Sequence, residues 1–183
     1  MPLASSTPGQ DRPRHVSAEP VTTGGLSSWQ TDPVDRTIIT NLDIDPALVF
    51  GVVSDLTTFP DWLDLVRRVE PTSPADNDPG PAYAVTLRAN IGPFSRSKRL
   101  RMCRAGIDAS TGHVEFVRHE TDGRQHADWR MTADVTAGTN SDTASVVLIR
   151  LEYSGQMWSN LLDGALEHAV GRATSKLALR AGR

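Results

Sequence analysis

Apolar residues alternate with polar or small ones along much of the chain after residue 80. In residues 83–89, for example, Tyr83, Val85 and Leu87 are separated by small or polar side chains. A period of two residues is typical of a strand that buries one face and exposes the other. The pattern predicts strands at residues 36–44, 83–89, 97–104, 113–119, 124–135 and 143–153.

Helical spacing of apolar residues occurs at both ends of this run of strands. Asp45-Pro46 is typical of a helix start, because Asp accepts hydrogen bonds from free N–H groups and Pro suits the first helical position. A break at residues 57–60 separates this helix from a second short one predicted at 61–66. The chain closes with a predicted long helix at 156–180.

The order of these elements indicates the fold class. A strand, two short helices, about five further strands and a terminal helix favour an α+β fold over a parallel α/β fold. We expect a curved antiparallel sheet of about six or seven strands that grips the long C-terminal helix. The outer face of such a sheet can meet water, as the alternation requires.

The first 33 residues form a separate compositional region. Ser, Thr, Pro and Gly make up about half of them, and large apolar residues are few. Such a segment cannot bury enough surface to offset the entropy lost on ordering. We therefore predict a disordered tail at residues 1–33 and one folded domain at residues 34–183.

Composition narrows the classes of function. The chain has 183 residues, of which 38% are hydrophobic, and a net charge of −3, so one real core is expected and a nucleic-acid partner is not. The single cysteine, Cys103, rules out an intramolecular disulfide and a multi-cysteine metal site, and fits a cytoplasmic location. No stretch approaches the roughly 18 apolar residues of a membrane span, so no integral membrane association is expected.

A basic run in the middle of the chain does not change this view. Its charges alternate with Leu100 and Met102, so several belong to one exposed strand face, which favours solvation over nucleic-acid binding. The run comprises Arg96, Lys98, Arg99, Arg101 and Arg104.

One hairpin has a register that the sequence predicts. Asp122-Gly123 is a strong signal for a two-residue turn. With that turn, Phe116 lies opposite Trp129, and Glu115 lies opposite Arg130. Apolar then matches apolar, and opposite charges match.

The same register argues against a metal site. His113, Glu115, His119 and His126 suggest a ligand cluster in the linear sequence, but they fall on the face opposite Phe116. We therefore expect a solvated or structural role for them and no metal.

The segment from Asp45 to Trp62 resembles a known family. Asp45-Pro46, Val49-Phe50, Asp55 and the tetrapeptide Phe59-Pro60-Asp61-Trp62 match the opening of START-like (SRPBCC) proteins of the polyketide cyclase/dehydrase and lipid-transport type. The resemblance extends through the strand count and the terminal helix, over residues 34–183. It implies a helix-grip fold with a deep, mostly apolar cavity between the sheet and the long helix.

Residues expected to line that cavity follow from strand parity and from one stripe of the long helix. On the helix, Gly164 would either leave open volume or let backbones pack closely, and the spacing favours neither. The predicted lining residues are Tyr83, Leu87, Met102, Phe116, Trp129, Met131, Tyr153, Met157, Leu161, Gly164 and His168.

The resemblance implies a protein that binds a hydrophobic small molecule or lipid, as a monomer or homodimer and without a cofactor. The sequence shows no paired carboxylates, Ser-His-Asp order or phosphate loop, which favours a non-catalytic role. A cyclase or dehydratase is the alternative, with His168 as the best acid/base candidate and Tyr83, Tyr153, Arg104 and Arg118 as further polar candidates. The two arginines lie near strand ends, which favours a position at the rim of the cavity over a buried cation. A protein-interaction module is the third possibility.

Trp62 has two possible places in such a fold. Phe59 and Trp62 lie three residues apart and can share one helix face. Trp62 would then either close one end of the core or form part of the cavity mouth. The first is favoured, because buried aromatic side chains mainly contribute apolar area.

Overall fold

A seven-stranded antiparallel sheet forms the body of the protein. The structure is a computed structural model that describes residues 34–91, 94–139, 143–155 and 172–182. The strand order is β1-β7-β6-β5-β4-β3-β2, which confirms the predicted α+β class and strand count. The strands are β1 (Val34–Leu42), β2 (Val66–Thr72), β3 (Ala82–Ile91), β4 (Phe94–Asp108), β5 (His113–Arg118), β6 (Trp129–Ala137) and β7 (Ser145–Tyr153).

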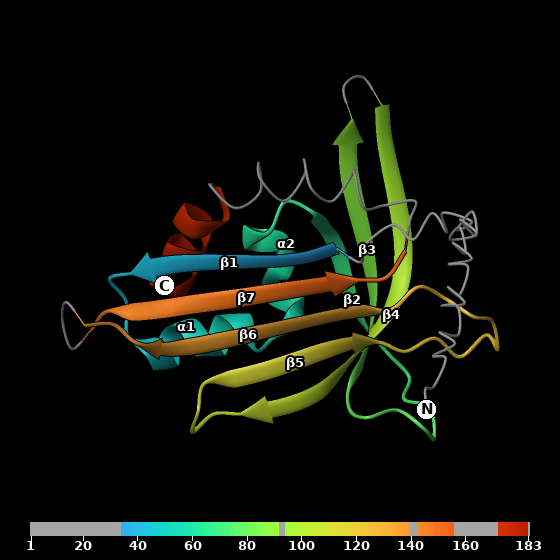
Figure 1. Cartoon of the computed structure of the whole chain (residues 1–183), viewed down its shortest axis with the longest axis horizontal. Coiled ribbons are helices and arrows are strands. Elements are labelled where there is room, and N and C mark those ends of the chain that lie inside the picture. Colours follow the sequence, from blue (N-terminus) through green and yellow to red (C-terminus); the bar gives the residue numbers. More distant parts are fainter. Residues whose placement is uncertain (1–33, 92–93, 140–142, 156–171, 183) are drawn as a thin grey trace, which may run out of the picture. The chain divides into compact units, whose positions relative to one another are not determined.

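The sheet is strongly bent. Figure 1 shows β1, β7, β6 and β5 running nearly side by side, whereas β3 and the upper part of β4 run at a steep angle to them. β4 has 15 residues and carries an irregularity between Arg104 and Gly106 where it pairs with β5. An extra residue in one strand bends it and increases its twist, so this bulge lets one strand serve both parts of the sheet.

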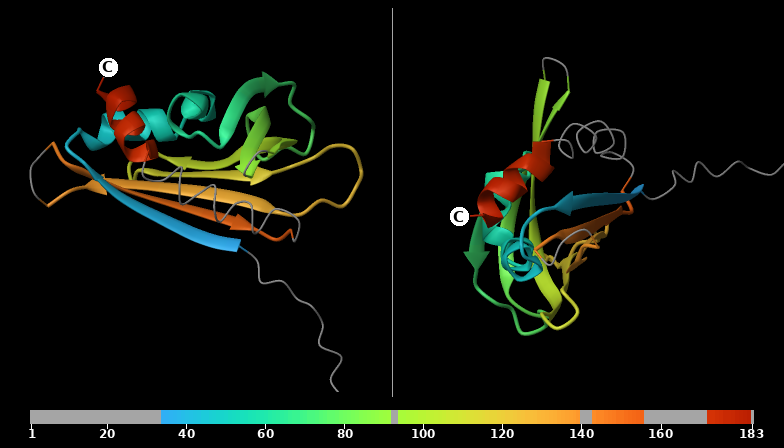
Figure 2. Two further views of the ribbon diagram at one scale, coloured as in Figure 1. Left: turned by 90° about the horizontal axis from the view of Figure 1, so that it is seen from above. Right: turned by 90° about the vertical axis from the view of Figure 1, so that its left-hand side faces the viewer.

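The helices lie on one face of the sheet (Figure 2). They are α1 (Pro46–Val53), the 3₁₀ turn η1 (Leu56–Thr58), α2 (Phe59–Trp62) and a C-terminal helix at residues 172–181. Residues 156–171 of the predicted long helix and the predicted disordered tail at 1–33 lie outside the described residues.

The start of α1 agrees with the sequence analysis. The Asp45 carboxylate accepts a hydrogen bond from the backbone N–H of Ala47 at 2.8 Å, and Pro46 occupies the first turn. Asp55 repeats this arrangement at η1, where its carboxylate accepts from the N–H of Thr57 at 2.9 Å. Both Asp residues therefore fix the points at which the chain turns onto the sheet.

The second short helix is confirmed, but its predicted bounds, residues 61–66, are wrong. α2 ends at Trp62, the backbone is extended at Leu63, and Val66 begins β2 by pairing with Leu87. Pairing with β3 supplies these backbone groups with partners, and the β-branched Val66 and Val69 fit the pleated edge. Tertiary pairing thus overrides the weak helical pattern.

The predicted register of β5 and β6 is displaced by two residues. Phe116 pairs with Met131, not with Trp129, and Val117 pairs with Arg130. A two-residue displacement keeps every side chain on its predicted face. The turn itself is longer than Asp122-Gly123, because Arg118 donates to the carbonyl of Ala127 at 3.1 Å and so holds residues 119–128 as a loop.

Aromatic side chains from α2 cover the centre of the concave face. Phe59 and Trp62 are each 1% exposed, and their ring centroids lie 4.5 Å apart. Phe59 also packs edge-on against Phe116 of β5, with 6.1 Å between centroids. This packing confirms that Trp62 is buried and places α2 over the middle of the sheet.

Two glycines with the same positive φ angle provide a test of the β4–β5 turn. Gly112 and Gly123 both have φ +70°, where an added Cβ is strained. A Cβ on Gly112 would lie 2.1 Å from the carbonyl oxygen of Val135, whereas a Cβ on Gly123 would meet nothing within 4 Å. We expect Gly123→Ala to lower the free energy of unfolding by roughly 1–2 kcal/mol, and Gly112→Ala by roughly 2–5 kcal/mol because the backbone must also shift. Urea unfolding followed by circular dichroism measures both; equal losses would contradict the close approach of Gly112 to β6.

Candidate functional site

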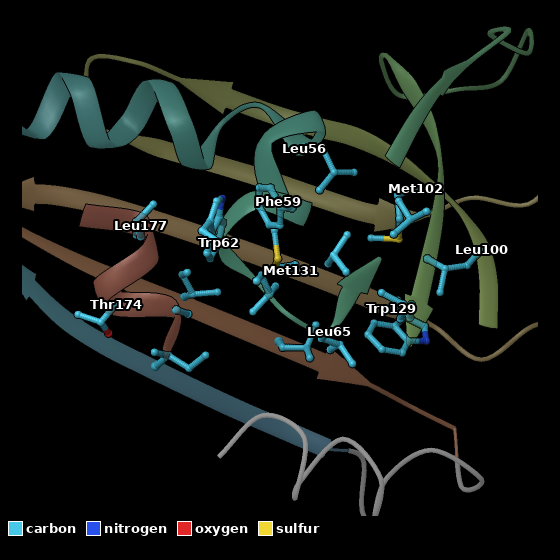
Figure 3. A pocket seen from close by; sticks show the side chains of 18 of the residues that line it. Leu56, Phe59, Trp62, Leu65, Leu100, Met102, Trp129, Met131, Thr174 and Leu177 are labelled. Atoms are coloured by element: carbon cyan, nitrogen blue, oxygen red, sulfur yellow. The ribbon is translucent and has the colours of Figure 1, made fainter. Parts of the chain in front are cut away.

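An apolar cavity lies between the concave face of the sheet and the helices. Its volume is about 70 Å³, and Figure 3 shows Phe59, Trp62 and Leu177 from the helices facing Met131, Met102 and Trp129 from the sheet. The lining residues are Ile38, Thr40, Leu56, Phe59, Trp62, Leu63, Leu65, Val66, Val85, Leu87, Leu100, Met102, Trp129, Met131, Ile149, Leu151, Ala173, Thr174 and Leu177.

The wall of this cavity has little polar character. Its hydroxyl groups belong to Thr40 of β1 and Thr174 of the C-terminal helix, and these bond to each other at 3.0 Å. The indole N–H of Trp62 is directed to Thr58 Oγ1 at 3.3 Å. No carboxylate, imidazole or amine is part of the wall that the described residues form. Such a wall favours an apolar ligand and offers nothing that would transfer a proton.

Several residues predicted to line the cavity do so. Leu87, Met102, Trp129 and Met131 all contribute side chains to the wall. Their common origin is the inward parity of β3, β4 and β6, which the alternating pattern predicts.

Other predicted residues lie elsewhere in the core. Phe116 is fully buried beneath Phe59, and Tyr153 packs against Trp129 with 4.8 Å between ring centroids. Tyr83 is half-buried at the edge of the hydrophobic cluster. Met157, Leu161, Gly164 and His168 lie outside the described residues.

The helical side of the wall was largely missed from the sequence. Phe59, Trp62 and Leu65 line the cavity, so Trp62 both closes the core and faces the cavity. The close spacing of large apolar residues from 59 to 66 was the available signal, but helical spacing alone does not separate a packed core from a cavity wall.

The cavity is smaller than the several hundred Å³ expected of a ligand site. One of its walls is the C-terminal helix, which also forms ion pairs at the protein surface. Arg172 and Lys176 pair with Asp64, and Arg180 pairs with Asp61. Exposed pairs of this kind contribute about 0–1 kcal/mol each, so this wall is held in place mainly by apolar packing.

A second cluster of chemical groups lies on the outer face of the sheet. The guanidinium of Arg101 binds both carboxylate oxygens of Asp78 at 2.5 Å and also donates to the carbonyls of Ser73 and His119 at 3.1 Å. The Asp78 side chain is 3% exposed. Arg101 thereby ties the connector between β2 and β3 to strands β4 and β5, and a bidentate buried pair of this kind is much less replaceable than a surface pair.

Asp78, Cys103 and His119 bring three possible metal-ligand atoms within 4.8 Å of one another. Arg101 already occupies both oxygens of Asp78, and a cation there would be repelled by it. Burial, followed by the contact with Asp78, raises the pKa of the Cys103 thiol to about 11, which disfavours the thiolate that a metal requires. The arrangement therefore acts as a structural anchor.

The histidines singled out in the sequence are not brought together. His113 pairs with Asp134 at 2.6 Å, His126 with Asp122 at 2.8 Å, and His119 with Asp78 at 3.0 Å. Each imidazole has a carboxylate of its own, so these residues do not form a shared site.

Two expectations about basic residues are wrong. Arg101 belongs to the buried anchor and not to a solvated face. Arg118 was expected at a rim, but its side chain is only 7% exposed and binds Glu120 at 2.7 Å. The partly buried Arg104 donates to the carbonyl of Ser54 at 3.4 Å. Strand parity was correct for Arg118, but the sequence did not identify the loop carboxylate that lets a cation be buried.

None of the described helices is long and apolar enough to cross a membrane.

Comparison with known proteins shows the fold but no close relative. Neither a protein family nor a curated protein matches the sequence. Among solved structures, the chain is similar to a START superfamily protein from Mycobacterium smegmatis, with a TM-score of 0.58, 12% identity, and coverage of 80% of this chain and 97% of that one. It is also similar to the Zhui aromatase/cyclase from Streptomyces sp. R1128, with a TM-score of 0.54, 12% identity and coverage of 83% and 95%. A third is Ara h 8.0201, with a TM-score of 0.54, 12% identity and coverage of 83% and 100%. The protein therefore has a START/SRPBCC-type fold.

The anchor on the outer face yields a prediction about acid stability. The bonds from Arg101, and then the N–H of Ala75, hold the pKa of Asp78 far below its usual range. A carboxyl whose pKa is lower in the folded state contributes stability above its unfolded pKa of about 3.9, and this contribution is lost as the pH falls below that value. Asp78→Asn should therefore lower the urea midpoint most at neutral pH, with a smaller difference from the wild type at pH 3.

Asp35→Asn is the matched control for this measurement. Asp35 also pairs with an arginine, Arg150, but its side chain is 48% exposed. We expect only a small change for Asp35→Asn. If both variants lose the same stability at pH 7, Asp78 does not anchor the connector.

Proposed function

We propose that this protein binds a small hydrophobic molecule in the cavity between the sheet and the helices, without catalysing a reaction on it. The observation that carries the proposal is the cavity wall, whose described residues are apolar apart from Thr40 and Thr174, which bond to each other. An apolar cavity is poorly filled by water and gains most by accepting an apolar ligand.

The size of the cavity favours a small ligand or a wall that moves. A volume of about 70 Å³ is below that of usual ligand sites. The C-terminal helix is the wall best suited to moving, because its ion pairs to Asp61 and Asp64 are exposed. Outward displacement of this helix would enlarge the cavity without breaking the sheet.

A cyclase or dehydratase is the second candidate, favoured by the similarity of fold to an aromatase/cyclase. Such a reaction requires groups that donate and accept protons inside the cavity. His168 remains the candidate from the sequence. Two results together would exclude the cyclase and favour the binding function: a His168→Ala variant that still binds ligand, and no turnover of a linear polyketone by the wild type.

The proposal also covers the domain organisation, the compartment and the oligomeric state of the protein. The ligand-binding unit is the domain at residues 34–183, the tail at 1–33 is dispensable for ligand binding, and the protein acts in the cytoplasm as a monomer or homodimer. The tail would instead be essential if the protein were an interaction module.

Binding can be measured with N-phenyl-1-naphthylamine, a neutral dye whose fluorescence rises in apolar surroundings. We expect saturable binding by the wild type. Leu87→Phe places a larger side chain in the wall and should weaken dye binding about tenfold, a change of about 1.4 kcal/mol. Native mass spectrometry of the protein as purified should also detect a bound small molecule.

Ile107→Phe is the matched control, since Ile107 is 49% exposed and lies outside the cavity wall. It should bind dye like the wild type. Absence of saturable binding by the wild type, or equal binding by the two variants, would exclude the cavity as the ligand site.

A further inference from the structure

One buried hydrogen-bond donor at the cavity wall has no acceptor. Trp129 is only 4% exposed, and its Nε1 has no hydrogen-bond partner among the described residues. Trp62, the other tryptophan of the wall, donates to Thr58 Oγ1 at 3.3 Å. Buried donors in native proteins are nearly always paired, so an unpaired one calls for an explanation.

Trp129 lies at the end of the cavity far from the C-terminal helix. Figure 3 shows its ring beside Leu100, with the nitrogen on the side of the ring turned away from Trp62 and Leu177. Trp129 also lines a second pocket, which contains cations such as Arg118 and carboxylates such as Asp128. The indole therefore stands where the apolar wall meets polar groups.

The inward-facing residues around this end of the sheet are cationic and aromatic. Lys98 shares the inward parity of Leu100 and Met102, and its Nζ lies 5.3 Å from the centre of the Tyr153 ring. Tyr153 in turn packs on Trp129 at 4.8 Å between ring centroids. Burial, and then the charge of Arg118, lowers the pKa of Lys98. The ammonium of Lys98 and the guanidinium of Arg118 thus lie near Tyr153, with the carboxylate of Glu120 beside Arg118.

We infer that Trp129 and Lys98 form a head-group site for a ligand with an apolar body and a terminal carboxylate. This inference rests on the proposed ligand-binding function and specifies the ligand class. The indole N–H would donate to one carboxylate oxygen, and the ammonium of Lys98 would offset the charge. The apolar body would lie along Met131 and Met102 toward Phe59.

Arg118 has a supporting place in this site. Its guanidinium is bound to Glu120 at 2.7 Å and to the carbonyl of Ala127 at 3.1 Å. It holds the loop that follows β5, and because Glu120 offsets its charge, we assign the carboxylate of the ligand to Lys98.

Three six-carbon compounds separate the contributions to binding: hexanoate, hexan-2-one and hexane. Each is titrated against the full-length protein that carries bound N-phenyl-1-naphthylamine, and dye displacement gives the affinity. We expect hexanoate to bind most tightly, hexan-2-one next and hexane least, because only the first two have an acceptor and only the first has a charge.

Two variants test the residues. Trp129→Phe keeps an apolar ring but removes the donor, so affinity for hexanoate and hexan-2-one should fall about tenfold while that for hexane stays the same. Lys98→Met should weaken hexanoate alone. Without ligand, Trp129→Phe should lower the urea midpoint less than Trp62→Phe does, because both remove the same buried volume and only Trp62→Phe also removes a hydrogen bond.

Trp62→Phe is the matched control, because it removes an indole that has a partner at the other end of the cavity. It should leave the ratio of hexanoate to hexane affinity unchanged. If Trp129→Phe also leaves that ratio unchanged, Trp129 Nε1 serves only an ordered water and the inference is overturned, whereas the proposed function stands as long as hexane and the dye bind. If neither hexane nor the dye binds the wild type, the proposed function itself fails.

Discussion

The packing of α2 on the concave face of the sheet is the contact on which the rest of the structure depends. The inward side chains of seven strands need an apolar cover, and Phe59 and Trp62 supply its centre. Asp55 caps the 3₁₀ turn η1, which leads directly into this short helix, and Pro60 lies in the first turn of the helix. Immediately afterwards the chain becomes β2, so the same segment covers the sheet and adds an edge to it.

Strand parity separates two kinds of chemistry across one sheet. In β4, Leu100 and Met102 face the cavity, while Arg101 and Cys103 belong to the polar anchor on the other face. The anchor resists change because Asp78 is buried and bound through both oxygens. The cavity side resists less, because its cover depends on apolar packing that has no fixed direction. A fold of this kind can therefore keep its sheet rigid while the helical wall adapts to a ligand.

Features that depend on local patterns could be predicted from the sequence. The strand faces, the start of α1 at Asp45 and the α+β class required only periodicity and capping. The β5–β6 pairing was displaced because Arg118 stabilises a long loop through Ala127, a contact that no turn signal encodes. β2 was missed because its pairing with β3 outweighs local preference. The anchor joins Asp78 to Arg101 and His119, residues far apart in the chain, and parity alone could not indicate that they meet.

Two features of the cavity lower the stability of the fold. An empty volume of about 70 Å³ in a core corresponds to a loss on the order of 2 kcal/mol, and an unpaired indole N–H adds a further roughly 1–3 kcal/mol. A larger side chain at Leu87 would fill the volume, and phenylalanine at Trp129 would remove the donor. Natural sequences depart from good packing and full hydrogen bonding mainly at functional sites. The void and the unpaired donor both belong to the wall of one cavity, and a ligand with an apolar body and an oxygen at one end would relieve both costs at once.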